Sequence, residues 1–133
     1  MTKQITSEYE TLDWKETTYV ERTVDRKITQ VTAKGTFSGA VTGSGDVAYL
    51  LTYNGAHCDF IGYESVTGTV DGRNGSFVLQ YLGSTAEGGL VATATVVPDS
   101  GTDELKGLRG TGGYKWNGGE SQKAVLTLDY SID

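Results

Sequence analysis

The sequence predicts an all-β fold: a closed antiparallel meander barrel of about eight strands, in one domain spanning residues 1–133. Strand-length runs rich in Val, Thr, Tyr, Ile and Leu recur between clusters of Gly, Asn and Asp. No long stretch carries the i, i+3, i+4, i+7 apolar spacing of an amphipathic helix. Glycine accounts for 19 of the 133 residues, about twice its usual share, and glycine is unfavourable inside helices.

Eight candidate strands follow one another along the chain. They are Lys3–Trp14, Lys27–Gly39, Asp46–Tyr53, Asp59–Val70, Ser76–Leu82, Leu90–Val97, Leu105–Tyr114 and Lys123–Ile132. The segment Lys15–Arg26 is charged and less regular, so a loop, a short helix and an additional strand all stay open for it.

Turn residues separate these runs. Gly43-Ser44-Gly45 and Asn54-Gly55 are predicted to turn the chain on either side of the third strand. The strongest hairpin signal is Asp71-Gly72-Arg73-Asn74-Gly75. Pro98-Asp99-Ser100-Gly101 is expected to end the sixth strand because proline cannot donate to the ladder. Asn117-Gly118-Gly119 is predicted to make the last turn.

The short connections predict that consecutive strands pair antiparallel. Closing the sheet removes its unpaired edges, and a barrel of about eight strands holds a side-chain core or one small ligand. Glycines inside strands mark bends or close packing. The glycines in such positions are Gly35, Gly62, Gly68, Gly110, Gly112 and Gly113.

Charge and the chain's opening limit the partners and the compartment. The net charge of −6 argues against nucleic acid and anionic membranes as partners. No apolar run reaches the length of a membrane span, and Met1-Thr2-Lys3-Gln4 does not open a signal peptide. We therefore expect a cytoplasmic protein whose single cysteine, Cys58, stays reduced.

Cofactor and metal motifs are not expected to function here. Gly43-Ser44-Gly45 and Gly110-Thr111-Gly112 lack the third glycine of a dinucleotide fingerprint and do not open a helix. His57 and Cys58 are too few for a zinc site. As neighbours on a strand they point to opposite faces, which also disfavours a catalytic dyad. The sequence therefore predicts no cofactor and no metal.

Aromatic residues on the predicted strands suggest two interpretations. Tyr49 and Tyr53 share one strand face by period two. If the next hairpin closes with Val70 opposite Gly75, Tyr81 lies on the face of Glu64, whereas a one-residue bulge would put Gln80 there instead. The aromatic set is either an ordinary core with exposed tyrosines or the lining of a cavity.

Glu64 is similarly ambiguous. It is either exposed, or buried with a partner such as Arg109, or placed in a cavity where a raised pKa would let it move protons. The site hypothesis gives Tyr53 and Tyr81 hydrogen bonds to a substrate oxygen, and lets Glu64 orient a phenol or accept a proton. Catalytic candidates are Tyr53, Tyr81 and Glu64; substrate-binding candidates are Tyr49, Trp116 at the mouth and, if the register slips, Tyr63 and Gln80.

Motifs from Tyr9 to Tyr130 support a resemblance. They are residues 60–64 (Phe-Ile-Gly-Tyr-Glu), 68–80, 96–102 and 105–112, with Trp14 and the closing Leu128-Asp129-Tyr130. The chain resembles a bacterial family of unknown function that is similar in fold to allene oxide cyclase-like barrels. Tyr81 stands where a His would be expected. The resemblance implies a closed calycin-like barrel, often oligomeric, on which cofactor-free cyclases act on fatty-acid-derived epoxides or on polyketides in bacterial secondary metabolism.

Three functions are then in competition. The first is a cofactor-independent cyclase or isomerase that folds an apolar polyene, in a cycloaddition for example, by proximity. The second is a non-catalytic carrier or sensor of an apolar small molecule. The third is a structural module filled by its own side chains. A cavity of several hundred Å³ favours the first two. Outward-facing Tyr and Val residues also suggest a small homo-oligomer.

Overall fold

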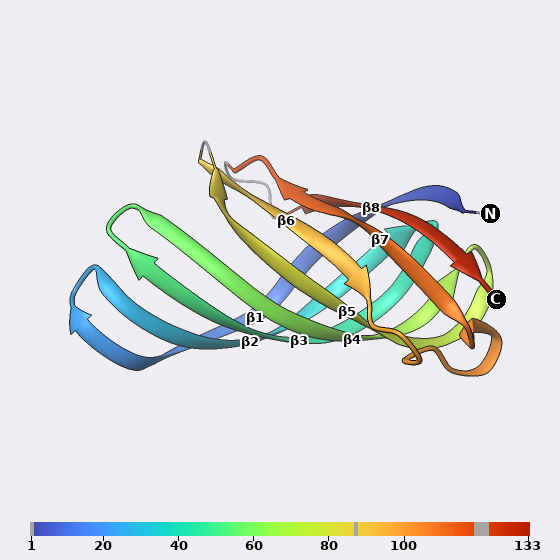
Figure 1. The fold of residues 1–133 in the computed structure, drawn as a ribbon, viewed down its shortest axis with the longest axis horizontal. Helices are drawn as coiled ribbons and strands as arrows, with labels where there is room; N and C mark the ends of the chain where they lie inside the picture. Colours follow the sequence, from blue (N-terminus) through green and yellow to red (C-terminus); the bar gives the residue numbers. More distant parts are fainter. Residues whose placement is uncertain (1, 87, 119–122) are drawn as a thin grey trace.

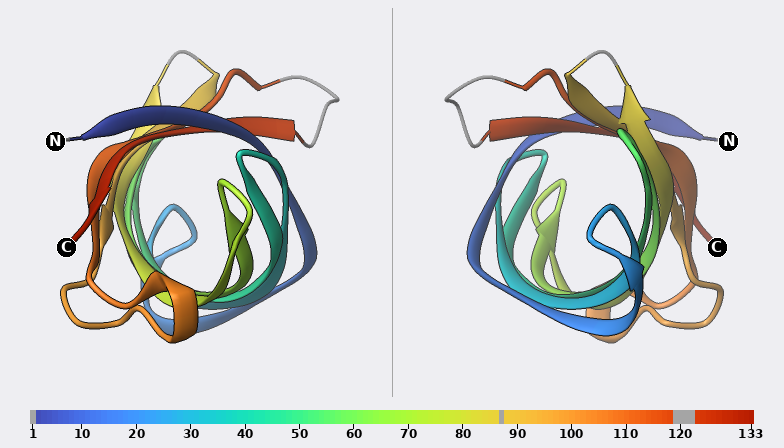
Figure 2. Two further views of the ribbon diagram at one scale, coloured as in Figure 1. Left: turned by 90° about the vertical axis from the view of Figure 1, so that its right-hand side faces the viewer. Right: turned by 90° about the vertical axis from the view of Figure 1, so that its left-hand side faces the viewer.

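The computed structural model describes residues 2–86, 88–118 and 123–133, which form a closed barrel of eight antiparallel strands (Figure 1). Each strand pairs with the next, and β8 returns to pair with β1, as the view along the ring shows (Figure 2). The predicted all-β meander barrel is therefore confirmed. The strands are β1 (Lys3–Thr23), β2 (Arg26–Gly39), β3 (Val41–Asn54), β4 (His57–Val70), β5 (Arg73–Ala86), β6 (Gly89–Val96), β7 (Leu108–Trp116) and β8 (Lys123–Ile132).

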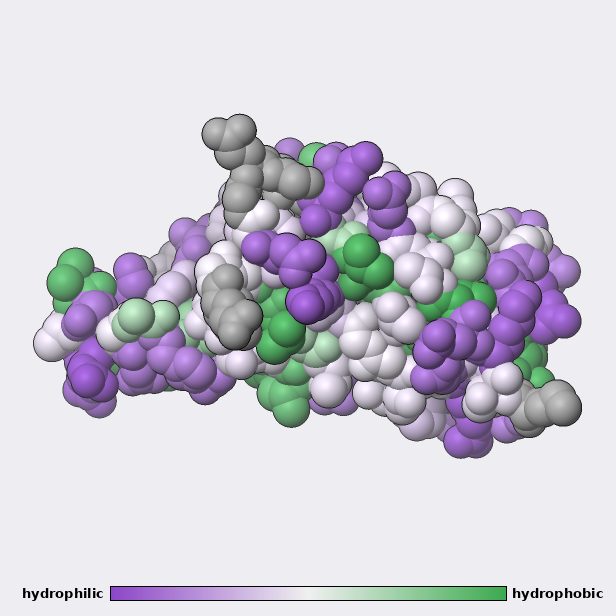
Figure 3. Space-filling view, turned by 90° about the horizontal axis from the view of Figure 1, so that it is seen from above, coloured by the Kyte–Doolittle hydropathy of each residue, from purple (hydrophilic) through white to green (hydrophobic). Residues whose placement is uncertain are grey.

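Most of the charged segment Lys15–Arg26 is strand: Lys15–Thr23 continues β1, Val24 and Asp25 form a turn, and Arg26 begins β2. The β1 part pairs with the first half of β2, with Lys15 opposite Thr32 and Thr23 opposite Arg26. The ladder is irregular between Leu12 and Lys15, where Asp13 has a positive φ of 54°. Residues 15–30 form a hairpin that extends beyond the ring, and we call it the β1–β2 arm (Figure 1). Hydrophilic residues dominate the end of the molecule where the arm lies (Figure 3).

The turn predicted at Gly43-Ser44-Gly45 is wrong, because these residues lie within β3. Gly43 pairs with Phe37 of β2 and with Gly68 of β4. A Cβ on Gly43 would lie 2.2 Å from the carbonyl oxygen of Thr67, so glycine here permits a close approach of two strands rather than a turn. The actual β2–β3 turn centres on Ala40, between Gly39 and Val41.

The β4–β5 hairpin is tighter than the predicted closure of Val70 on Gly75. Val70 pairs with Arg73, and Asp71 and Gly72 form a two-residue turn with φ values of 49° and 82°. Positive φ at both positions matches the twist of the strands. The register contains no bulge, so Glu64 and Tyr81 share the interior face, which is the bulge-free one of the two alternatives that the sequence left open.

One end of the barrel is closed by the connection between β6 and β7, and the strand predicted to begin at Leu105 begins three residues later. Residues Asp103–Leu105 form the short 3₁₀ helix η1, and β7 begins only at Leu108. Leu105 is fully buried against β5, and a Cβ on Gly75 would lie 3.1 Å from its Cγ. Val41, Val70 and Phe77 are also fully buried there. This end is therefore filled by the chain's own side chains.

The remaining expectations concern the chain's other turns and its outer face. Asn117 and Gly118 follow β7, but Gly119 of the predicted last turn lies outside the described residues. Leu50, Ile61 and Leu82 form an exposed row across β3, β4 and β5, and the homo-oligomer expected from outward apolar residues stays a prediction. In the described ranges, no helix has the length and apolar character needed to cross a membrane.

We expect Gly72→Ala to lower the free energy of unfolding by about 1 kcal/mol, the usual penalty for an L-residue in the left-handed region. A Cβ at Gly72 meets nothing within 4 Å, so the effect isolates backbone conformation. Gly113→Ala is the matched control, because a Cβ there meets only the Ala92 carbonyl at 3.5 Å and its φ is not in the positive region. Urea denaturation should leave Gly113→Ala unchanged or more stable; equal losses in both variants would refute the argument.

Candidate functional site

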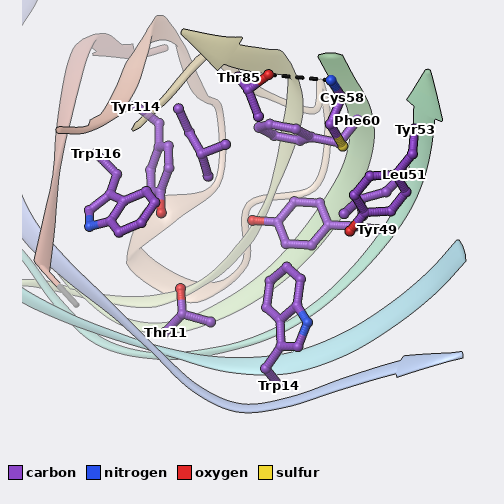
Figure 4. Close-up of a pocket in the computed structure, with 11 residues that line it drawn as sticks. Thr11, Trp14, Tyr49, Leu51, Tyr53, Cys58, Phe60, Thr85, Tyr114 and Trp116 are labelled. Carbon is purple, nitrogen blue, oxygen red and sulfur yellow. Dashed lines mark hydrogen bonds between the residues drawn. The ribbon is translucent and has the colours of Figure 1, made fainter. Parts of the chain in front are cut away.

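A pocket of about 340 Å³ occupies the open end of the barrel, opposite η1 (Figure 4). Six of its eleven lining residues are aromatic, and none is charged. The lining residues are Thr11, Trp14, Tyr49, Leu51, Tyr53, Cys58, Phe60, Thr85, Leu90, Tyr114 and Trp116. They come from β1 and from the ends of β3 to β7 that lie away from η1. Inward-facing aromatic residues from several strands therefore meet at one opening of the barrel.

Tyr49 is the central side chain of the pocket. Its ring lies 6.1 Å from that of Trp14 and 5.5 Å from that of Phe60, the latter edge to face. Figure 4 shows its hydroxyl pointing into the pocket, and no hydrogen bond between described residues engages this hydroxyl. Burial raises the pKa of Tyr49 well above its usual value, so the hydroxyl is a neutral donor or acceptor available to a ligand.

Beneath the pocket lies the Glu64 network, which we define as Glu64, Tyr9 and Tyr81. The Glu64 side chain is fully buried. Tyr9 donates a hydrogen bond of 2.9 Å to its Oε2, and Tyr81 donates one of 2.7 Å to its Oε1. Gly35 and Gly45 leave room for the carboxyl group, since a Cβ on either would lie 2.3 or 2.2 Å from Oε2. Residues from five consecutive strands, β1 to β5, thus hold or make room for one carboxylate inside the barrel.

Burial raises the pKa of Glu64 to about 7, although the hydrogen bonds from Tyr81 and Tyr9 favour the ionised form. Burial also raises the pKa of both tyrosines, and the neighbouring Glu64 charge adds to the increase. The phenols therefore stay protonated while the carboxyl titrates near neutral pH. In the part of the chain that the structure describes, no ion pair includes Glu64.

Two tyrosines separate the Glu64 network from the open pocket. The Tyr81 ring lies 6.1 Å from that of Tyr49 and 5.7 Å from that of Tyr114, and the Tyr9 ring lies 5.5 Å from that of Tyr114. Tyr49 and Tyr114 line the pocket, whereas Glu64 does not. We call Tyr49 and Tyr114 the pocket floor. A ligand in the pocket would contact the floor, and the charge of Glu64 would reach that ligand only through the rings of Tyr49 and Tyr114.

A second carboxylate organises the rim. Glu16 of the β1–β2 arm accepts hydrogen bonds from Tyr53 at 2.6 Å, from Thr29 at 2.7 Å and from Trp14 at 3.0 Å. Partial burial opposes ionisation, but these hydrogen bonds hold the pKa of Glu16 below its usual value. The ammonium of Lys27 lies 5.4 Å from the centre of the Tyr53 ring. This rim cluster fixes the arm beside two pocket residues.

The predicted site residues fall into three groups. Tyr49, Tyr53 and Trp116 line the pocket. Glu64 and Tyr81 lie inside the barrel but beneath the floor, where they bind one another. The remaining two, Tyr63 and Gln80, do not belong to the pocket, and that prediction is wrong. Tyr63 is 51% exposed and accepts a hydrogen bond from Gln80 on the outer face. The bulge that would have put Gln80 on the face of Glu64 is absent, and the register does not slip to bring Tyr63 inward.

Two further predictions concern partners. The suggestion that Arg109 pairs with Glu64 is wrong, because Arg109 lies on the outside of the barrel and pairs with Asp133 at 3.0 Å. Cys58 and His57 do point to opposite faces: Cys58 lines the pocket, and His57 contacts Asp59 on the surface. Among residues 2–86, 88–118 and 123–133, no group of three or more His, Cys, Asp or Glu is placed to hold a metal ion.

Two residues central to Glu64 and to the rim, Tyr9 and Glu16, were not among the predicted site residues. Tyr9 shares parity with Ile5, Ser7 and Thr11 in the first predicted strand, so period-two alternation could have placed it inside. No such signal existed for Glu16, because the arm to which it belongs is exposed along nearly its whole length. Its role depends on contacts between strands: Tyr53 of β3 donates a hydrogen bond to Glu16, and the β2 half of the arm pairs with β3.

Comparisons with known proteins identify a family without assigning an activity. The family model described as "Protein of unknown function (DUF3224)" matches residues 5–130. A solved structure of a DUF3224 protein of unknown function from Shewanella oneidensis is 24% identical, with a TM-score of 0.72, and the match covers 100% of this chain and 99% of that one. No curated protein matches the chain. Because the family match spans nearly all of its residues, the chain belongs to the DUF3224 family of proteins of unknown function.

Proposed function

We propose that this barrel binds an apolar small molecule in the pocket at its open end, as a carrier or sensor. The observation that carries the proposal is the pocket itself, of about 340 Å³, with six aromatic and no charged lining residues. Small-molecule sites are typically concave, mostly apolar and supplied with a few polar groups for orientation. The unengaged Tyr49 hydroxyl is such a group (Figure 4).

The arrangement of polar groups favours binding over catalysis. A catalytic group must reach the reacting atoms, but Glu64 and Tyr81 bind each other beneath the floor. The Tyr53 hydroxyl donates to Glu16 at the rim. These three candidates do not converge on one point in the pocket, whereas its aromatic faces offer contact area to any flat hydrophobic ligand.

Binding can be tested with the neutral fluorescent probe N-phenyl-1-naphthylamine. Leu90 lines the pocket, while its neighbour Val91 is 41% exposed on the outer face of the same strand. We expect Leu90→Trp to fill part of the pocket and weaken probe binding at least tenfold, about 1.4 kcal/mol. The matched variant Val91→Trp should bind like the wild type. Melting temperatures serve as the folding control. Absence of binding by the wild type, or equal loss in both variants, would refute the proposal.

A second candidate function is a cofactor-independent cyclase or isomerase. The observation that favours it is a carboxyl group with a pKa of about 7 directly behind the pocket floor, which is suited to proton transfer at neutral pH. On this hypothesis the Tyr49 hydroxyl polarises a substrate carbonyl and the aromatic walls impose a ring-forming conformation. Recovery of a bound ligand unchanged after incubation indicates a carrier; its conversion to an isomer indicates an enzyme.

A further inference from the structure

The barrel interior contains a carboxylate without a positively charged partner. Glu64 is fully buried, and its hydrogen bonds come from the neutral phenols of Tyr9 and Tyr81. None of the ion pairs among the described residues includes it. A buried carboxylate is costly unless a cation or many hydrogen bonds compensate its charge. When it is ionised, Glu64 therefore places a negative charge inside the barrel that no positively charged partner within the described ranges offsets.

The pocket above this carboxylate presents aromatic faces and no cation. Trp14, Tyr49, Phe60, Tyr114 and Trp116 surround the space, and Lys and Arg are absent from the lining residues in the described part of the chain. The face of an aromatic ring carries negative potential and attracts a cation placed within about 6 Å. Aromatic faces and a carboxylate thus favour the same sign of charge in a ligand.

The rim already contains one contact of this kind. Lys27 places its ammonium 5.4 Å from the centre of the Tyr53 ring, and Glu16 accepts a hydrogen bond from the same tyrosine. At the rim, the positive charge of Lys27 offsets the negative charge of Glu16 and contributes to lowering the Glu16 pKa. Glu64 is the carboxylate left uncompensated near the pocket. Its charge also raises the pKa values of Tyr49 and Tyr114, so its field reaches the floor.

We propose that the pocket takes a hydrophobic cation, an aromatic or alkyl ammonium, whose charged group lies against the Tyr49 and Tyr114 floor above the Glu64 carboxylate. The inference rests on the proposed binding function and specifies its ligand class. Quaternary ammonium groups suit such a site because their charge can be stabilised by aromatic faces without a hydrogen-bonding partner. The apolar part of the ligand would fill the space toward Trp14 and Trp116.

The proposal implies a pH dependence of a definite sign. The ionised form of Glu64 attracts a cation, so affinity should rise between pH 6 and 8 as this carboxyl, with a pKa of about 7, loses its proton. The titratable groups facing it are Tyr9 from β1, Tyr49 from β3, Tyr81 from β5 and Tyr114 from β7; burial raises the pKa of each, so they stay protonated. Asp46, on the outer face of β3, adds a charge that raises the Glu64 pKa, and Lys34 pairs with Asp46.

The test uses two probes of matched shape: benzyltrimethylammonium and its neutral isostere neopentylbenzene. Each competes with N-phenyl-1-naphthylamine for the full-length protein at pH 6 and pH 8. At pH 8 we expect the cation to displace the dye at a concentration at least tenfold lower than the isostere. In Glu64→Gln this preference should shrink to less than threefold and lose its pH dependence, while the isostere binds as before.

A second pair of variants keeps the test decisive if Glu64→Gln does not fold. Tyr49→Leu removes an aromatic face from the floor, and Tyr49→Phe retains it. We expect Tyr49→Leu to weaken binding of the cation several-fold more than Tyr49→Phe does, with no such difference for neopentylbenzene. Equal or better binding of the isostere, sensitive to Leu90→Trp, would overturn the cation proposal and leave the binding function standing. Failure of the dye and both probes to bind would overturn both.

Discussion

Replacing Gly45 with alanine is expected to lower the free energy of unfolding by about 4 kcal/mol. The new Cβ would lie 2.2 Å from Oε2 of Glu64 and 2.7 Å from its Cδ and Cγ, and this carboxyl is held by Tyr9 and Tyr81. Overpacking of a core typically costs about 1–3 kcal/mol. Displacing the carboxyl also leaves buried phenols without their acceptor, which costs about 1–3 kcal/mol more. Urea denaturation at pH 7 measures the sum.

A double-mutant cycle with Glu64→Ala identifies the cause. The three atoms nearest to a Cβ at Gly45 all belong to Glu64, so Gly45→Ala should cost less than about 1 kcal/mol once that side chain is removed. The coupling between the two positions should therefore be about 3 kcal/mol, at the upper end for residues in contact. If Gly45→Ala costs the same in both backgrounds, the glycine is required for backbone reasons and not for the Glu64 carboxyl.

The fold was predictable because alternation and turn chemistry act locally. Parity placed Tyr49 and Tyr53 on one strand face and, for a hairpin without a bulge, Glu64 and Tyr81 on a shared face. The tight Asp71-Gly72 turn keeps that parity. The length of β1 was not predictable, because the arm is exposed along nearly its whole length and carries no alternation from burial. Only the ladder with β2, from Lys15 opposite Thr32 onward, holds it as a strand.

The candidate site was only partly predictable. The alternation of residues along a strand tells which face a side chain lies on, but not how deep in the barrel it lies. Tyr49 and Glu64 both point inward, yet one lines the pocket and the other lies beneath its floor. The depth at which each side chain lies depends on what packs around it inside the barrel. Leu105 of η1 fills one end, and Tyr9 of β1 reaches across to hydrogen-bond Glu64. Such contacts join residues far apart in sequence, and a single sequence read by itself gives no signal for them.

Glu64 should also make the stability of the barrel depend on pH. Its pKa rises from 4.5 to about 7 on folding, chiefly through burial, so between these values the folded state binds more protons than the unfolded state. Stability from this group is therefore fully present below pH 4.5 and is lost as pH rises through 7. With about 1.4 kcal/mol per pKa unit, the wild type should lose roughly 3 kcal/mol between pH 4 and pH 8 through this carboxyl.

The comparison with Glu64→Gln isolates that contribution. An amide keeps the size of the carboxyl and can accept from Tyr81 and donate to Tyr9, but it does not titrate. Glu16 and Asp71, whose pKa values are lowered, change stability in the opposite direction at low pH, and they do so in both proteins. Unfolding free energies from urea titrations at pH 4, 5.5, 7 and 8 should thus show the wild type weakening relative to Glu64→Gln as pH rises. A difference that stays constant, or that grows in favour of the wild type at high pH, would mean that the carboxyl ionises in the barrel at least as easily as in water. Glu64 would then stay charged from pH 6 to pH 8, and the rise in cation affinity expected over that range would be absent.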